Sequence, residues 1–164
     1  MVTPAVTVHG RRLREQTLRR LAVAMLALLL AQYILGMLVN FFVTIPDDHP
    51  GAHPAEYFSG AATSVAWALG HGGWELIAHA WTGILIGTLG IAMIALALML
   101  RRRAWVVATI LGFFGTLGAG FNGASFLNYG EDFSSLIMAT AFLIALGSYA
   151  LGLYYTKPAS QTAA

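Results

Sequence analysis

The chain has 164 residues, of which 58% are hydrophobic and only 10% are charged, and its formal net charge is +2 at pH 7. Soluble domains carry about 25% charged and about 45–50% apolar residues, whereas disordered chains are poor in apolar residues. The composition, with a mean hydropathy of +0.71, therefore excludes both classes. The lack of cysteine excludes disulfides, thiolate metal sites and thiol catalysis.

The first 20 residues form a basic tail with five arginines, Arg11, Arg12, Arg14, Arg19 and Arg20. Such a cluster can indicate nucleic-acid binding. Directly before an apolar stretch, however, basic residues commonly contact anionic lipid headgroups. We therefore predict that this tail contacts the lipid bilayer and binds no nucleic acid.

Four stretches are long and apolar enough to cross a membrane. A spanning helix needs roughly 20 apolar residues, because about 30 Å of hydrocarbon is crossed at about 1.5 Å per residue. The four stretches lie at about 21–43, 74–100, 104–127 and 133–155. The sequence therefore predicts an all-α fold, a four-helix bundle that forms one membrane domain over residues 21–157.

The basic residues predict the orientation of these spans. All nine Lys and Arg residues precede the first span, join the second to the third at 101–103, or follow the fourth at Lys157. The loop 44–73 and the turn around Glu131 contain none. Since cytoplasmic segments are enriched in Lys and Arg, we expect a multi-pass protein of the cell membrane with both termini in the cytoplasm. Residues 158–164 would be a disordered cytoplasmic tail.

Tryptophan and tyrosine residues near the span ends agree with this arrangement, because their amphipathic rings favour the membrane interface. At the outer interface we expect Trp74, Trp81 and Tyr129, and at the inner interface Trp105, Tyr154 and Tyr155.

The outer loop 44–73 divides into two parts. Three prolines and a glycine within 45–54 exclude a helix there. From Ala55 to about Leu69 the sequence is compatible with a helix, with Pro54 at a permitted starting position. Because apolar residues recur on one side, this part predicts a short interfacial helix on the outer surface.

The third span carries two rows of small residues, Gly112, Thr116, Gly120 and Ala124, and Gly115, Ala119 and Gly123. Small residues let membrane helices approach closely, which is how such helices associate. We therefore expect the third span to lie centrally and to touch at least two neighbours, with Gly120 at a helix contact.

Polar residues recur at one depth near the outer edge of the membrane. Counting the helical rise from the flanking arginines places Asn40, His79 and Asn122 at the same level. Polar groups at this depth tend to face the bundle interior. We therefore expect these three side chains to form a polar pocket that opens outward and could hold a cofactor.

A second pattern suggests metal binding. His71, Glu75 and His79 are spaced by four and would share one face if the second span begins early enough. The loop repeats a similar spacing with His49 and His53. Imidazole and carboxylate ligands suit zinc, copper, iron or nickel. The alternative is that these side chains are only hydrated or hydrogen-bonded at the interface.

Haem is a further alternative. Bis-histidine ligation would pair His79 with His49 or His53, or methionine would supply the second ligand from Met37 or Met138. The stretch Glu75-x3-His79 is loosely similar to the glutamate-and-histidine helix of haem A synthases, whose spacing is one residue shorter.

A broader resemblance covers the end of the first span and the start of the loop. Ile34-Leu-Gly-Met-Leu-Val-Asn40, Thr44-Ile-Pro46 and His49-Pro-Gly51 resemble segments of small bacterial four-span integral membrane proteins of uncharacterised function. This resemblance implies the topology and no activity.

Two functions of different classes follow from these patterns. The first is a membrane protein that binds a transition metal (Zn, Cu or Fe) or haem in the outward pocket. The second is a ligand-free structural or accessory subunit that packs on a membrane-protein partner or on copies of itself. A metal-assisted enzyme is a weaker third class, because the sequence has no nucleophile elbow and no His-Glu-x-x-His spacing.

Overall fold

The computed structural model describes residues 4–156, which form five α-helices and no strand. The helices are α1 (Pro4–Phe42), α2 (Tyr57–His71), α3 (Gly73–Leu100), α4 (Arg103–Tyr129) and α5 (Asp132–Tyr155). All except α2 are long and apolar enough to cross a membrane. This confirms the predicted all-α fold with four spans and a short additional helix. The tail predicted to be disordered, 158–164, lies outside the described residues.

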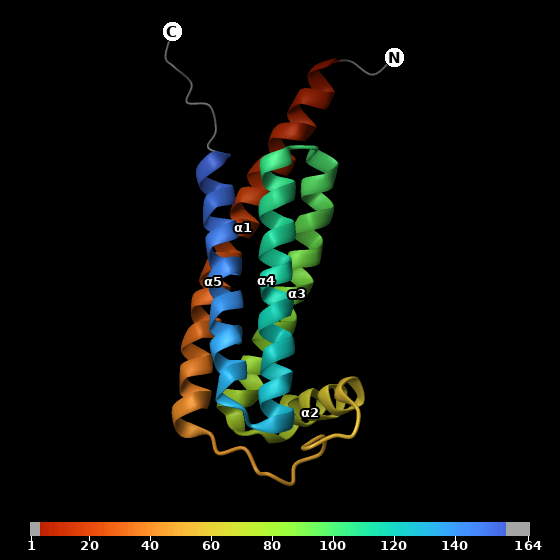
Figure 1. Cartoon of the computed structure of the whole chain (residues 1–164). Coiled ribbons are helices and arrows are strands. Elements are labelled where there is room, and N and C mark those ends of the chain that lie inside the picture. Colours follow the sequence, from red (N-terminus) through yellow and green to blue (C-terminus); the bar gives the residue numbers. More distant parts are fainter. Residues whose placement is uncertain (1–3, 157–164) are drawn as a thin grey trace.

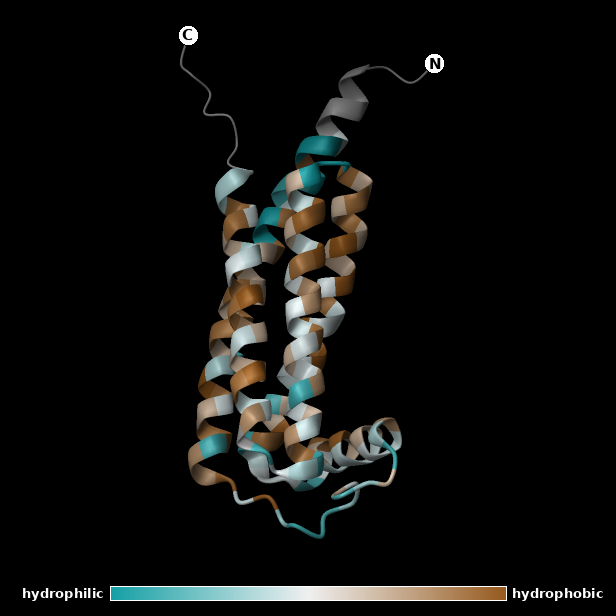
Figure 2. Cartoon of the chain, viewed as in Figure 1, coloured by the Kyte–Doolittle hydropathy of each residue, from teal (hydrophilic) through white to brown (hydrophobic). Residues whose placement is uncertain are grey.

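The four long helices run side by side, and α2 lies across one end of them (Figure 1). The start of α1 and the end of α5 both lie at the opposite end. We call these ends the α2 end and the termini end. Hydrophilic residues concentrate at both ends, whereas the middle of the long helices is largely hydrophobic (Figure 2).

The basic tail is part of the first helix rather than a separate segment. We expected the helix to start near residue 21, whereas α1 begins at Pro4. The reason is that hydropathy marks where a helix meets lipid and not where its backbone hydrogen bonds begin. The charged residues before Leu21 are compatible with a helix that continues beyond the apolar layer.

Helix α4 contacts more than two neighbours, as predicted, and α3 likewise contacts three helices, α1, α4 and α2. Helix α4 contacts α5 most extensively and also contacts α3 and α2. Helix α1 contacts α3 and α5, and within residues 4–156 it contacts no other helix.

The close contact between α4 and α5 depends on glycines of α4. A Cβ atom added at Gly115 would lie 2.7 Å from the backbone nitrogen of Ala145 and 2.8 Å from the carbonyl oxygen of Ala141. A Cβ atom at Gly112 would lie 2.6 Å from the ring of Tyr149. Only glycine allows the two backbones to approach this closely.

The expected contact at Gly120 is wrong, because nothing lies within 4 Å of a Cβ atom added there. At about 100° per residue, a row of every fourth residue turns about 40° around the helix at each step. Gly120 therefore points about 80° away from Gly112, and it is exposed.

Most of the aromatic side chains that we expect at the membrane interfaces are exposed. Trp74, Trp81, Tyr154 and Tyr155 are all more than half exposed, and Tyr129 is 39% exposed. Trp105 is instead completely buried. Its ring lies against Gly152 of α5, where the missing side chain leaves room for the indole.

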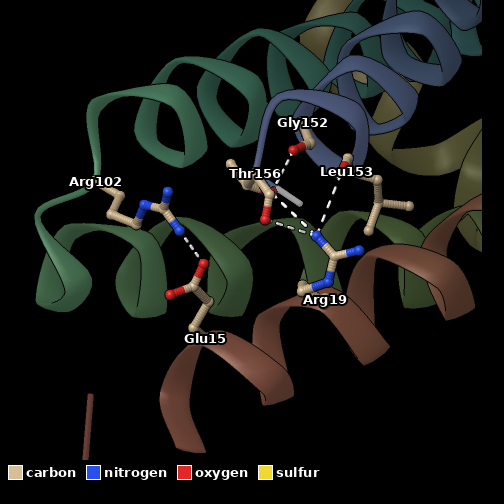
Figure 3. Close-up of polar contacts among 6 residues, drawn as sticks. All are labelled: Glu15, Arg19, Arg102, Gly152, Leu153 and Thr156. Carbon is tan, nitrogen blue, oxygen red and sulfur yellow. Dashed lines mark hydrogen bonds and ion pairs between the residues drawn. The ribbon is translucent and has the colours of Figure 1, made fainter. Parts of the chain in front are cut away.

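Polar contacts of α1 tie it to its neighbours at the termini end (Figure 3). Arg19 Nη1 donates hydrogen bonds to the carbonyl oxygens of Thr156 (2.8 Å) and Leu153 (3.3 Å) at the end of α5. Glu15 forms an ion pair with Arg102 in the connection between α3 and α4. These contacts fix the position of α1 along both neighbours.

Candidate functional site

A cavity of about 210 Å³ lies at the α2 end, between the last turns of α1 and α4 and the loop that joins α1 to α2. Its polar lining residues are Asn40, Asp47, His49, His53, Asn128 and Tyr129. Of the three residues expected at one level in the pocket, only Asn40 lines this cavity.

His49 fixes the loop to the helices. Its side chain is 5% exposed, and its ring stacks on Trp67 of α2 with a centroid distance of 4.6 Å. Nε2 lies 2.9 Å from the carbonyl oxygen of Leu127, and Nδ1 lies 3.0 Å from that of Pro50. Both ring nitrogens therefore lie within hydrogen-bond distance of backbone carbonyls, of which a neutral ring donates to one, and His49 acts as a structural residue.

Asn128 joins α4 to both α2 and the loop. Its Oδ1 accepts a hydrogen bond from Ser64 Oγ (2.7 Å), and its carbonyl oxygen accepts one from the His53 backbone nitrogen (2.8 Å). Its Nδ2 atom is buried and has no hydrogen-bond partner in the described part of the chain. Nothing in the sequence around Asn128 indicates these partners, so its role was missed.

Close packing holds the same loop against α2. Gly51 has a φ of +96°, and a Cβ atom added there would lie 2.6 Å from the Ser64 backbone nitrogen. Both the backbone conformation and the space require glycine at this position. The cavity is thus bounded by a well-packed loop.

Helix α2 is fixed at its first turn. The Glu56 carboxylate caps the helix by accepting hydrogen bonds from the backbone nitrogens of Phe58 (3.0 Å) and Ser59 (2.7 Å), and these bonds lower its pKa. Tyr57 donates a hydrogen bond to the carbonyl oxygen of Phe121 on α4 (2.7 Å). Burial, with a smaller contribution from Tyr129, raises the pKa of Tyr57.

The Glu56 cap predicts that the first turn of α2 loosens in acid. Because the folded pKa lies below the ordinary value of about 4.5, the stabilisation is fully present above that value and is lost as the pH falls through the lowered pKa. The backbone amide NMR signals of Phe58 and Ser59 should report this transition. Glu56→Gln should abolish it, and titration of the parent at the ordinary carboxyl value would contradict the capping role.

His79 lies on α3 but faces α1 rather than the cavity. Its Nε2 is 3.1 Å from Gln32 Nε2, and its ring lies against Gly36. His79 Nδ1 and Gln32 Oε1 are buried without a partner among residues 4–156. Asn122 donates its hydrogen bond to Gly118 O of its own helix (2.8 Å). Among the described residues, no hydrogen bond joins Asn40, His79 and Asn122 to one another, and only Asn40 lines the cavity.

The expected shared face of His71, Glu75 and His79 is wrong. His71 is the last residue of α2, and α3 begins at Gly73, whose φ of +77° marks the change of direction. His71 is exposed at this break, and only Glu75 and His79 lie on α3. Within residues 4–156, no three His, Asp or Glu side chains converge closely enough to hold a metal ion.

The α2 end favours cations. Every Lys and Arg of the described segment lies in the first part of α1 or in the connection 101–103, at the termini end. The cavity is lined by the last turns of α1 and α4, and the C-terminal end of a helix carries partial negative charge. Together with the Asp47 carboxylate, these turns attract positive charge.

Comparison with known protein families, curated proteins and solved structures finds no match to this chain. The resemblances to haem A synthases and to small bacterial four-span membrane proteins therefore stay predictions.

Proposed function

We propose that this is a membrane protein that binds a divalent transition-metal ion in the cavity at the α2 end. The observation that carries the proposal is the set of donors on the cavity wall, Asn40, Asp47 and His53, at the end of the bundle without basic residues. Their amide, carboxylate and imidazole groups are exposed. Since nitrogen and oxygen donors together suit zinc, copper or nickel, these ions are the expected ligands.

The site would be open and only partly supplied by the protein. His49 and Asn128 line the same cavity, but their polar atoms have other partners. Both ring nitrogens of His49 lie close to backbone carbonyls, and Oδ1 of Asn128 accepts a hydrogen bond from Ser64. Asp47 and His53 are therefore the principal ligands, and water completes the coordination. Such a site exchanges its ion readily, which suits a sensor or carrier better than a structural metal centre.

Haem has less support. A bis-histidine site requires a second histidine opposite His79. The side chain that contacts His79 Nε2 is instead Gln32. The transition-metal ion is therefore the better interpretation of the donors.

We expect His53→Ala and Asp47→Asn each to weaken Zn²⁺ or Ni²⁺ binding about tenfold, as loss of one ligand removes at least one strong contact. The measurement is isothermal titration calorimetry of the full chain in mild detergent. His71→Ala is the matched control, because this exposed histidine lies outside the cavity. Binding should also decline on acidification, since imidazole binds metal only without its proton.

Equal affinity of His53→Ala and the parent would contradict the proposed site. A parent protein that binds no metal and co-purifies with other membrane proteins would instead favour the alternative function, a ligand-free accessory subunit.

We further propose that the protein lies in the cell membrane with the α2 end outside and both termini in the cytoplasm. The proposal is supported by the arginines at the termini end, because basic residues are retained on the cytoplasmic side. A reporter active only in the cytoplasm should be active when fused after Lys157 and inactive when inserted at Gly51. The reverse pattern would overturn the orientation.

A further inference from the structure

A groove at the termini end combines arginine and apolar side chains. It has a volume of about 290 Å³ and is lined by Arg19, Arg20 and Val23 of α1 and by Leu153 of α5. Arg20 is exposed, and Val23 is 59% exposed. Positive charge beside an accessible apolar surface fits an amphiphilic ligand with an anionic head.

Arg19 is held in place at one side of this groove. Its Nη1 atom donates to the last carbonyl groups of α5, as Figure 3 shows. A guanidinium group has five N–H donors, and the described residues supply partners for Nη1 alone. The remaining donors are therefore fixed in position, which lowers the entropic cost of binding an anion.

Charge around the groove is strongly positive. Within residues 10–156 this end carries eight arginines and one acidic residue, Glu15, which is already paired with Arg102. Arg20 forms no ion pair with any described residue. An anionic ligand is therefore favoured both by the nearby guanidinium groups and by the surrounding field.

We infer that this groove binds one anionic phospholipid, whose phosphate contacts Arg19 and Arg20 and whose acyl chain lies along Val23 and Leu153. Guanidinium groups match the geometry of phosphate oxygens. Arg20 directly precedes Leu21, where the apolar stretch begins, so the arginines lie at headgroup level. Basic pockets between membrane helices are known to bind anionic headgroups. The site lies at the opposite end from the metal cavity and does not depend on it.

The test uses native mass spectrometry of the full chain in mild detergent with an equal mixture of phosphatidylglycerol and phosphatidylcholine. We expect the parent to retain phosphatidylglycerol preferentially and Arg20→Gln to bind it about tenfold more weakly, because a charge-assisted hydrogen bond is lost. Arg12→Gln is the matched control, since it removes the same charge from the same helix outside the groove. It should change the affinity less than about twofold.

Equal losses in the two variants would overturn the inference, because they would indicate diffuse charge attraction without a site. Glycerol 3-phosphate, which has the headgroup phosphate and no acyl chain, should not displace phosphatidylglycerol at equal concentration. Displacement would also overturn the inference, because the groove would then be a simple anion site.

Discussion

Replacing Gly115 by alanine should destabilise the bundle, whereas the same replacement at Gly120 of the same helix should not. The methyl group at Gly115 would meet the backbone of α5 at 2.7–2.8 Å, and no flexible side chain can move aside to relieve the contact. Overpacking of this kind costs about 1–3 kcal/mol. At Gly120 the methyl group meets nothing within 4 Å, and alanine favours the helix over glycine.

The measurement is SDS-induced unfolding in mixed micelles, followed by circular dichroism for the parent and the two variants. A lower SDS midpoint for Gly115→Ala, with an unchanged or higher midpoint for Gly120→Ala, is the expected result. Identical midpoints would mean that α4 and α5 do not pack through this face.

Replacing His49 by alanine should release the loop from the α2 end. The carbonyl oxygen of Leu127 would lose its hydrogen bond to the ring (2.9 Å), and an unsatisfied buried polar group costs about 1–3 kcal/mol. Loss of the stacking on Trp67 removes about 0.5–1.5 kcal/mol more. We therefore expect faster hydrogen exchange across residues 44–56 and a shift in the fluorescence of Trp67.

His71→Ala provides the comparison for this effect, because it removes the same side chain from an exposed position at the end of α2. Its exchange pattern should match that of the parent. If His49→Ala leaves the exchange of the loop unchanged, the loop is held by its other contacts, such as the hydrogen bond between His53 N and Asn128 O.

The four long apolar helices were predictable because the hydropathies of consecutive residues add up along the chain. Long apolar runs between charged or proline-rich segments determine where a helix meets lipid, and the four long helices agree with them. The side of a helix that faces a neighbour cannot be obtained by summing the properties of its own residues, since it depends on the partner helix. The contact at Gly115 could have been predicted only from α5, where Ala141 and Ala145 are spaced by four and offer the complementary small surface.

The candidate site was less predictable, because it is built from contacts between distant segments. The pairing of Ser64 with Asn128 joins residues 64 positions apart and leaves no pattern in the sequence. The break between His71 and Glu75 did have a signal, the pair Gly72 and Gly73. Two adjacent glycines permit a reversal of the chain, and Gly73 adopts a positive φ.

The pairing of the first helix with the last sets an order for biogenesis. Helix α1 can dock on α3 as soon as the second span is inserted, and α4 and α5 can close as a hairpin of neighbours in the sequence. The contact of Arg19 with the end of α5, however, needs Thr156, which is synthesised 137 residues after Arg19. These contacts allow assembly by the joining of two halves, α1 with α3 and α4 with α5. Until α5 has been inserted, the surface of α1 that will meet α5 stays open to lipid.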